Sequence, residues 1–257
     1  MRQTCVMQID LNADVGESSG AQVVGNDPTL IPHVTSVSIA CGAHAGDEPT
    51  MRATLRLAQT HGVSAGAHPG FADRDGFGRR EQHLSPMALE DLVRSQVQRL
   101  MAIAHDEGVV LRHVKPHGAL YNMACRDREM AEAICRAVDS CSPSLAVLGL
   151  PGSALVAAAE AAGLRAVAEG FIDRAYHADG RLVARTVPGA VLHDLDRVTE
   201  RAVTMVTTGT VPTLEGPAIA LPVETLCIHG DTPGAAQVAA RVRSALTGAG
   251  VDVRRWR

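Results

Sequence analysis

Residues 7–17 read MQIDLNADVGE, and the alternation within this stretch is the strongest indication of the fold. Because successive side chains of a strand point to opposite faces, one face of this strand is polar and the other apolar. The polar face carries Gln8, Asp10, Asn12 and Asp14. An open parallel sheet is covered by helices and is apolar on both faces. A parallel barrel has its active site at the C-terminal ends of its strands. The stretch therefore favours a barrel.

The same pattern recurs along the chain. Four further predicted strands carry small or polar residues on one face, and each such face ends in an ionisable group: Ser38, Ala40, Gly42 and His44; Ser64, Gly66 and His68; His113, Lys115 and His117; Cys227, His229 and Asp231. We predict strands over residues 6–12, 36–42, 63–67, 109–115, 145–149, 166–172 and 224–229, and a short one over 251–254. Helices are predicted between them over 48–61, 86–106, 127–139, 153–162, 195–207 and 233–246.

No linker or low-complexity segment interrupts these strand–helix units, so the sequence predicts a single domain over residues 1–257. The predicted fold is α/β, a TIM-like (β/α) barrel with seven strands. Helix starts carry their usual signals: Ser85 and Thr232 each precede a proline, and each is expected to cap a helix that begins at that proline.

Composition excludes several classes of function. With 46% hydrophobic and 20% charged residues the chain is globular, and its net charge of -4 argues against binding to nucleic acid. No apolar run of 18 residues and no signal peptide are present, so we expect a cytoplasmic protein with no membrane association. Six cysteines without a C-x-x-C pair predict reduced thiols and no structural zinc site. The basic residues 254–257 are interpreted as a solvated terminus.

Lys115 is the single lysine of the chain and lies between Val114 and Pro116, so a phosphate-binding Gly-Lys-Ser/Thr loop is excluded. The same predicted strand face carries His113 and His117. A strand exit pointing to solvent would also explain three polar residues. However, the chain uses arginine everywhere else, and lysine offers a compact charge with a tunable pKa. Lys115 and His117 are therefore candidate catalytic residues.

Two further groups of polar residues on the predicted strands are candidates for the site. Asp10, Asn12 and Asp14 offer carboxylates and an amide for general base or metal chemistry, although a capped turn after a strand would have the same sequence. His44 and His68 share a Gly-Ala-His-x-Gly core, which favours a function over a purely structural role.

Three segments flank the predicted mouth of the barrel. Residues 71–80 carry Arg79 and Arg80, which suit a phosphate-gripping lid or a solvated loop. Residues 178–185 follow Glu169 and predict a hairpin arm over the mouth. Residues 227–234 bring His229, Asp231 and Thr232 to a predicted helix N-terminus, where backbone N–H groups favour an anion.

Seven motifs occur in order: DLNADVGE, CGAHAGD, GAHPGF, GFGRR, VKPHGALYN, EGFIDRAY and CIHGDTPG. Together, from Asp10 to Asp231, they resemble the 5-oxoprolinase A-subunit family, formerly called lactam-utilisation proteins. The resemblance implies a barrel related to the carbohydrate deacetylases. It also implies a hydrolase complex with two partner subunits that binds ATP as co-substrate and opens 5-oxoproline to L-glutamate.

The resemblance leaves the metal question open. The wider deacetylase group uses an adjacent pair of aspartates and an Asp-His-His metal site. Here Asp10 and Asp14 are separated, and the His-x3-His at 113 and 117 lies on a predicted strand. A divalent metal is therefore neither assigned nor excluded, and a homo-oligomer also stays open.

The expected reaction phosphorylates the amide oxygen of the lactam, after which water attacks the activated carbon. We predict Asp14 or His68 as base, His44 or His117 as acid, and Lys115 with Arg79 and Arg80 at the phosphate. The predicted catalytic set is Asp10, Asn12, Asp14, His44, His68, Lys115, His117 and His229. The predicted substrate- and phosphate-binding set is Arg79, Arg80, Glu169, Asp231 and Thr232. Two alternatives remain: a stand-alone metal-dependent deacetylase or amidase, and a non-catalytic subunit that positions its partners.

Overall fold

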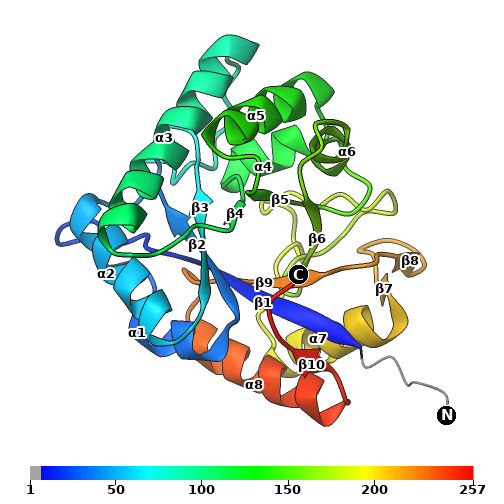
Figure 1. Ribbon diagram of the computed structural model, residues 1–257. Coiled ribbons are helices and arrows are strands. Elements are labelled where there is room, and N and C mark those ends of the chain that lie inside the picture. Colours follow the sequence, from blue (N-terminus) through cyan, green and yellow to red (C-terminus); the bar gives the residue numbers. More distant parts are fainter. Residues whose placement is uncertain (1–6, 257) are drawn as a thin grey trace, which may run out of the picture.

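Seven parallel strands close into a barrel in the computed structural model, which describes residues 7–256 (Figure 1). In barrel order the strands are β1 (Gln8–Val15), β2 (Ser36–Ala40), β3 (Ser64–His68), β4 (His113–Val114), β5 (Ala146–Gly149), β6 (Ala166–Phe171) and β9 (Thr225–His229). The barrel closes because β9 pairs with both β6 and β1. A short strand, β10 (Asp252–Val253), adds to the start of β1. The predicted seven-stranded barrel is confirmed.

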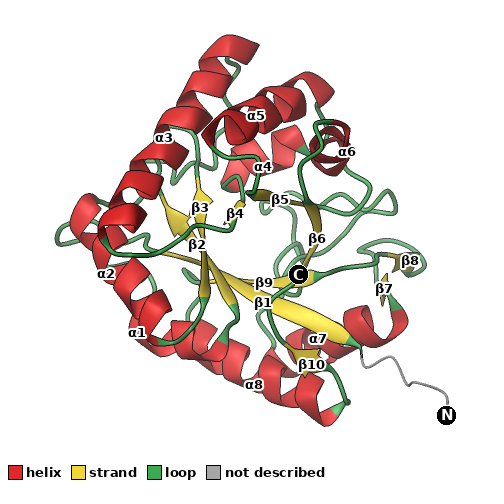
Figure 2. Cartoon of the chain, viewed as in Figure 1, coloured by secondary structure: helices red, strands yellow, loops and turns green. Residues whose placement is uncertain are grey.

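The helices form a layer outside the barrel (Figure 2). They are α2 (Glu48–Thr60), α3 (Pro86–Asp106), α5 (Arg128–Cys141), α6 (Ala154–Ala161), α7 (Leu195–Thr208) and α8 (Ala235–Gly248). The apolar face of β1, with Ile9, Leu11, Ala13 and Val15, is buried in the core that the strands share with these helices. Within residues 7–256, no helix combines the length and apolarity that crossing a membrane needs. The five cysteines of the same range are free thiols, whereas the one at position 5 lies outside the described residues.

Several short elements were not predicted. They are α1 (Asp27–Leu30), the 3-10 helix η1 (Ile31–His33), α4 (Gly118–Ala124) and the antiparallel pair β7 (Thr210–Val211) and β8 (Ile219–Ala220). Each is too short for its periodicity to be visible in the sequence. The predicted arm over 178–185 forms a turn with a bridge between Tyr176 and Leu182, but no regular strands.

The predicted start of the last helix is wrong. Helix α8 begins at Ala235, because Gly234 occupies the N-cap position with a φ of 78° that a glycine adopts readily. Thr232 therefore lies in the turn before the helix and provides no cap. Ser85, in contrast, caps α3 as predicted by accepting a hydrogen bond from the amide of Ala88.

The inside of the barrel is filled in layers. At the N-terminal end of the strands, Ala146, Leu148 and Val167 form a small apolar cluster with Trp256 packed against it. The interpretation of the C-terminal residues as a merely solvated segment is therefore wrong for Trp256. The next layer contains the ring of His113, whose Nε2 lies 3.1 Å from the hydroxyl of Ser38. Burial lowers the pKa of His113 to about 3, so this ring is neutral.

Gly66 faces the His113 ring, and a Cβ placed there would lie 2.3 Å from it. We expect Gly66→Ala to lower the free energy of unfolding by about 1–3 kcal/mol, the usual cost of overpacking a core. Denaturant titration measures the change. The matched control is Gly248→Ala at the end of α8, where no atom lies within 4 Å of the added Cβ and stability should hold. Equal stability of Gly66→Ala and the parent would contradict the packing argument.

Candidate active site

A cavity of about 650 Å³ opens at the C-terminal ends of the strands. Some of the predicted site residues line it: Asp14, His68, Arg79, Lys115, His117 and His229. The others lie outside its lining: Asp10, Asn12, His44, Arg80, Glu169, Asp231 and Thr232. The polar strand faces thus do converge on one mouth, but only their last residues reach the cavity.

Lys115 lies at the floor of the cavity, with only 2% of its surface exposed. Its ammonium lies 2.8 Å from Asp14 Oδ1 and 2.7 Å from Glu169 Oε1, and donates to Asn12 Oδ1 at 3.2 Å. Burial alone would lower the pKa of Lys115, but the neighbouring carboxylates outweigh this effect and raise it well above its usual value. Lys115 therefore carries a fixed positive charge, paired with Asp14 and Glu169, at the floor of the cavity.

Asp10 and Asn12 belong to the layer below. Asp10 accepts hydrogen bonds from the hydroxyls of Thr35, Ser36 and Thr225, at 2.5–2.7 Å. Asn12 donates to Glu169 Oε1 at 3.0 Å and so helps to hold the carboxylate that faces Lys115. Both side chains are fully buried. Asp10 and Asn12 therefore hold the neighbouring side chains in place from the layer below. Of Asp10, Asn12 and Asp14, only Asp14 lines the cavity and can contact a bound molecule.

Three histidines and a glutamate gather beside this floor. His44 stacks on His117 with ring centroids 3.8 Å apart, and both rings meet His68 edge-on. Glu17 Oε1 lies 3.8 Å from His44 Nε2 and 3.9 Å from His117 Nδ1. Burial, together with the negative charges of Asp14 and Asp231, raises the pKa of Glu17 well above its usual value.

The hydrogen bonds of His68 and His117 fix where their protons are. His68 Nδ1 lies 2.7 Å from the carbonyl oxygen of Lys115, and His117 Nε2 lies 2.8 Å from that of Phe77. A carbonyl only accepts, so both nitrogens must donate. The remaining nitrogens, His68 Nε2 and His117 Nδ1, face each other at 3.0 Å. In neutral rings both carry lone pairs, so this contact requires a cation between or on them.

The segment over residues 71–80 is tied to the barrel mouth. Arg74 donates to the carbonyl oxygens of Gly42 and Gly46 at 2.8 and 2.6 Å, and Phe77 packs edge-on against His44 and His117. Arg79 reaches the cavity and pairs with Asp231 at 2.5 Å. Of the two predicted arginines, only Arg79 therefore reaches the cavity, because Arg80 lies at the surface and pairs with Asp73.

His229 is held by a carboxylate that the sequence analysis did not single out. Its Nδ1 lies 2.7 Å from Asp173 Oδ2, and its ring stacks on Phe171. Burial would raise the pKa of Asp173, but the interactions with His229 outweigh it and lower the pKa. An ionised Asp173 fixes the His229 tautomer with the proton on Nδ1 and leaves Nε2 free for proton transfer.

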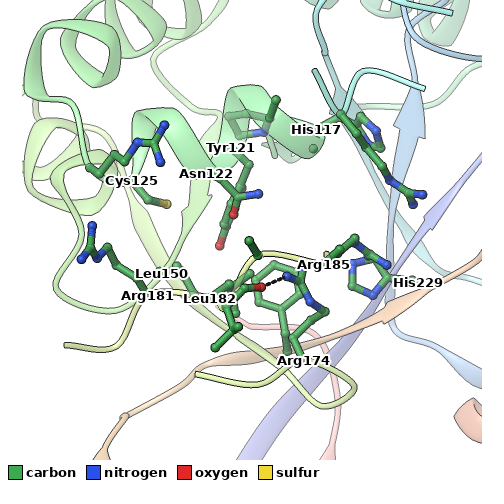
Figure 3. A pocket seen from close by; sticks show the side chains of 18 of the residues that line it. His117, Tyr121, Asn122, Cys125, Leu150, Arg174, Arg181, Leu182, Arg185 and His229 are labelled. Atoms are coloured by element: carbon green, nitrogen blue, oxygen red, sulfur yellow. Dashed lines mark hydrogen bonds between the residues drawn. The ribbon is translucent and has the colours of Figure 1, made fainter. Parts of the chain in front are cut away.

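One wall of the cavity is strongly basic (Figure 3). Arg174 and Arg185 lie beside His229 there, across from Tyr121 and Asn122 of α4. Arg174 is buried and donates to the carbonyl oxygen of Val183 at 2.5 Å, and burial lowers its pKa to about 10. Within residues 7–256, neither arginine has a carboxylate within salt-bridge distance. Guanidinium groups that form no direct ion pair suit carboxylate or phosphate ligands.

Sequence reasoning missed Glu17, Tyr121, Asp173, Arg174 and Arg185 as site residues. All but Arg185 lie inside the quoted motifs, so the motifs themselves were the available signal. Arg185 is the last residue of the predicted arm, and its role depends on how that arm folds over the mouth. The assembled site has a buried cation, a carboxylate-held histidine and two free arginines, a set suited to polar bond cleavage in an anionic substrate.

Comparison with known proteins identifies the family. Residues 9–257 match the model of the LamB/YcsF family. The 5-oxoprolinase A subunit of Symbiobacterium thermophilum is 52% identical, with 96% of this chain and 95% of the relative aligned. The protein of the same name from Thermus thermophilus is 50% identical over 96% of this chain and 99% of its own length. The crystal structure of a lactam utilization protein from Thermus thermophilus superposes with a TM-score of 0.92 at 48% identity, covering 97% of this chain and all of the other. The chain belongs to the LamB/YcsF family.

Proposed function

We propose that this protein is one subunit of an ATP-dependent 5-oxoprolinase, a hydrolase complex that converts the lactam 5-oxoproline to L-glutamate while ATP is hydrolysed to ADP and phosphate. The full-length similarity to proteins named as the A subunit of 5-oxoprolinase supports the substrate. The observation that carries the proposal is the basic cavity, because 5-oxoproline carries a carboxylate and its activated form would carry a phosphoryl group as well. The site offers separate cations for both.

The proposed chemistry follows from the stability of the substrate. A five-membered lactam is an unstrained, resonance-stabilised amide, so phosphorylation of its oxygen is needed before water can attack. Lys115 and Arg79 then face the phosphoryl group, and Arg174 with Arg185 binds the substrate carboxylate. His229, oriented by Asp173, takes a proton from the attacking water at its free Nε2 and passes it to the ring nitrogen as the C–N bond breaks. The acyl phosphate that results is hydrolysed by a second water to glutamate and phosphate. Asp14, beside Lys115 and 3.5 Å from His68 Nε2, is placed to orient the attacking water.

The proposed reaction also requires a site for ATP, which this chain is not expected to supply alone. The chain has no phosphate-binding loop, so we infer that two partner subunits supply the nucleotide site and form the complex with it. We place this complex in the cytoplasm. The purified chain alone should therefore release no glutamate from 5-oxoproline and ATP, even with Zn²⁺ and Mg²⁺ present.

Glutamate release measured for the chain alone, and after addition of both partner subunits, tests this prediction. Recovery of turnover only in the mixture is the expected result. Robust glutamate release by the single chain would contradict the proposal that the partner subunits supply the nucleotide site.

A second candidate function is a stand-alone metal-dependent amidase or deacetylase. The observation that favours it is the cluster of Glu17, His68 and His117, which resembles a metal-binding set. Hydrolysis of an amide without ATP, restored by metal after chelation, would favour this second function. A purely positioning subunit would have no use for the buried ionisable groups that line the cavity.

A further inference from the structure

We propose that Glu17, His68 and His117 form a binding site for one divalent transition-metal ion, with Zn²⁺ as the best match. Their candidate ligand atoms lie within 4.8 Å of one another. Glu17 follows β1, His68 ends β3 and His117 precedes α4, so the fold brings them together from three separate segments. The inference concerns binding and does not depend on the proposed reaction.

The hydrogen bonds of the two histidines are those of metal ligands. Metal-bound histidines usually donate their other ring N–H to a carbonyl or carboxylate, which fixes the ligating nitrogen. His68 and His117 do so, toward the carbonyl oxygens of Lys115 and Phe77. Their remaining nitrogens face each other at 3.0 Å, and two lone pairs at this distance need a cation. A proton shared between the two rings is the alternative, and the binding experiment below distinguishes it from a metal ion.

Distances to Glu17 fit the same ion. Ligands bound about 2.0–2.1 Å from a tetrahedral Zn²⁺ are about 3.4 Å apart. The observed separations are 3.0 Å between the two histidine nitrogens and 3.9 Å from His117 Nδ1 to Glu17 Oε1. A hydrogen bond would require the glutamate to be closer. Both separations lie within about 0.5 Å of that value, and all three ligand atoms lie within 4.8 Å of one another, so small side-chain movements would bring them around one ion.

His44 supplies an independent observation. It is 1% exposed, and neither ring nitrogen has a hydrogen-bond partner. Leaving such groups unpaired in the interior is costly. Its Nε2 points to the Glu17 side of the cluster, 3.8 Å from Oε1, so an ion or its bound water would supply the missing partner.

A second group of potential ligands, Asp14, Cys227 and His229, is the weaker candidate. The Lys115 ammonium already lies 2.8 Å from Asp14 Oδ1 and 3.1 Å from Cys227 Sγ. A second cation there would be repelled by the first. The Glu17 group has no such ammonium among its members.

The donor set selects the class of metal. Two imidazole nitrogens and one carboxylate oxygen suit Zn²⁺ and Co²⁺, whereas Mg²⁺ and Ca²⁺ require mostly oxygen ligands. Two histidines and a glutamate are also the three-ligand set of several hydrolytic zinc sites, which keep a fourth position for water. When bound there, such an ion supplies a Lewis acid and an acidified water at the edge of the cavity.

Metal binding by tag-free protein tests the assignment directly. After dialysis against a chelator, equilibrium dialysis with Zn²⁺ should give one ion per chain, and Co²⁺ should give visible absorption bands of a low-coordinate site. Mg²⁺ at the same concentration should not compete. Glu17→Gln and His117→Gln should each weaken Zn²⁺ binding by more than about 10²-fold, beyond the roughly 10–100-fold that the loss of an outer hydrogen-bond partner costs.

Two control variants separate this site from other binding. Cys227→Ser removes a ligand of the weaker group, and His193→Ala removes an exposed histidine; both should bind Zn²⁺ like the parent. Circular dichroism confirms that each variant is folded. Loss of Zn²⁺ binding in Cys227→Ser would overturn the proposal. So would a folded parent that binds no Zn²⁺, which would mean that the two histidines share a proton.

Discussion

Replacing Lys115 with Met will lower 5-oxoproline-dependent glutamate release by the reconstituted complex by about 10²-fold or more, the usual cost of losing an electrostatic stabiliser. Methionine keeps the apolar stem of the side chain and removes the ammonium with its charge. Lys115→Arg should fail as well, because the ammonium already has four partners within 3.2 Å and a planar guanidinium needs more room. Steady-state turnover with both partner subunits is the measurement.

The same substitution will cost stability. Removing the ammonium leaves Asp14 and Glu169 as buried carboxylates without their cation, and breaking a buried ion pair costs about 3–5 kcal/mol. The double variant Lys115→Met/Glu169→Gln removes one of these charges and should recover part of the loss, while turnover stays low. Activity within a few-fold of the parent in the folded fraction of either variant would make Lys115 a bystander.

Asp14→Asn should reduce turnover by about 10²–10⁴-fold, the range for removing a group that activates or orients the nucleophile. Burial would raise the pKa of Asp14, but His68 and Lys115 outweigh it and lower the pKa well below its usual value. Asp14 is therefore ionised, and the substitution removes a real charge from the cavity while keeping the shape of the side chain.

The matched control is Asp10→Asn, four positions earlier on the same strand face. Asp10 lies outside the cavity lining and contacts three hydroxyl groups, so turnover per folded molecule should stay within a few-fold of the parent. The folded fraction is measured by circular dichroism for both variants. Equal activity loss in the two, or full activity in Asp14→Asn, would contradict the assignment of Asp14 to the reactive end of the strand.

These two aspartates also show how much of the site can be predicted from the sequence. The alternation in residues 7–17 is enough to place Asp10 and Asp14 on one face, because the two-residue period of a strand is a local property. It cannot say how deep each residue lies. Depth depends on the pairing register, which sets Asp14 beside His229 and Asp10 beside Thr225. One aspartate therefore reaches the cavity and the other a ring of hydroxyls.

The sequence by itself determined the seven-stranded barrel and the end of the barrel at which ionisable groups gather. Its predicted site residues include Asp14, His68, Lys115, His117 and His229, which the structure shows to line the cavity. Only the tertiary structure decided that Glu169 pairs with Lys115, that Asp173 holds His229, and that Glu17 joins the histidines. The structure also shows that Thr232 lies before the start of α8 and does not cap it. The physical reason is that side-chain alternation acts over a few neighbouring residues, whereas partners at a site are chosen by barrel closure and loop packing between segments more than fifty residues apart.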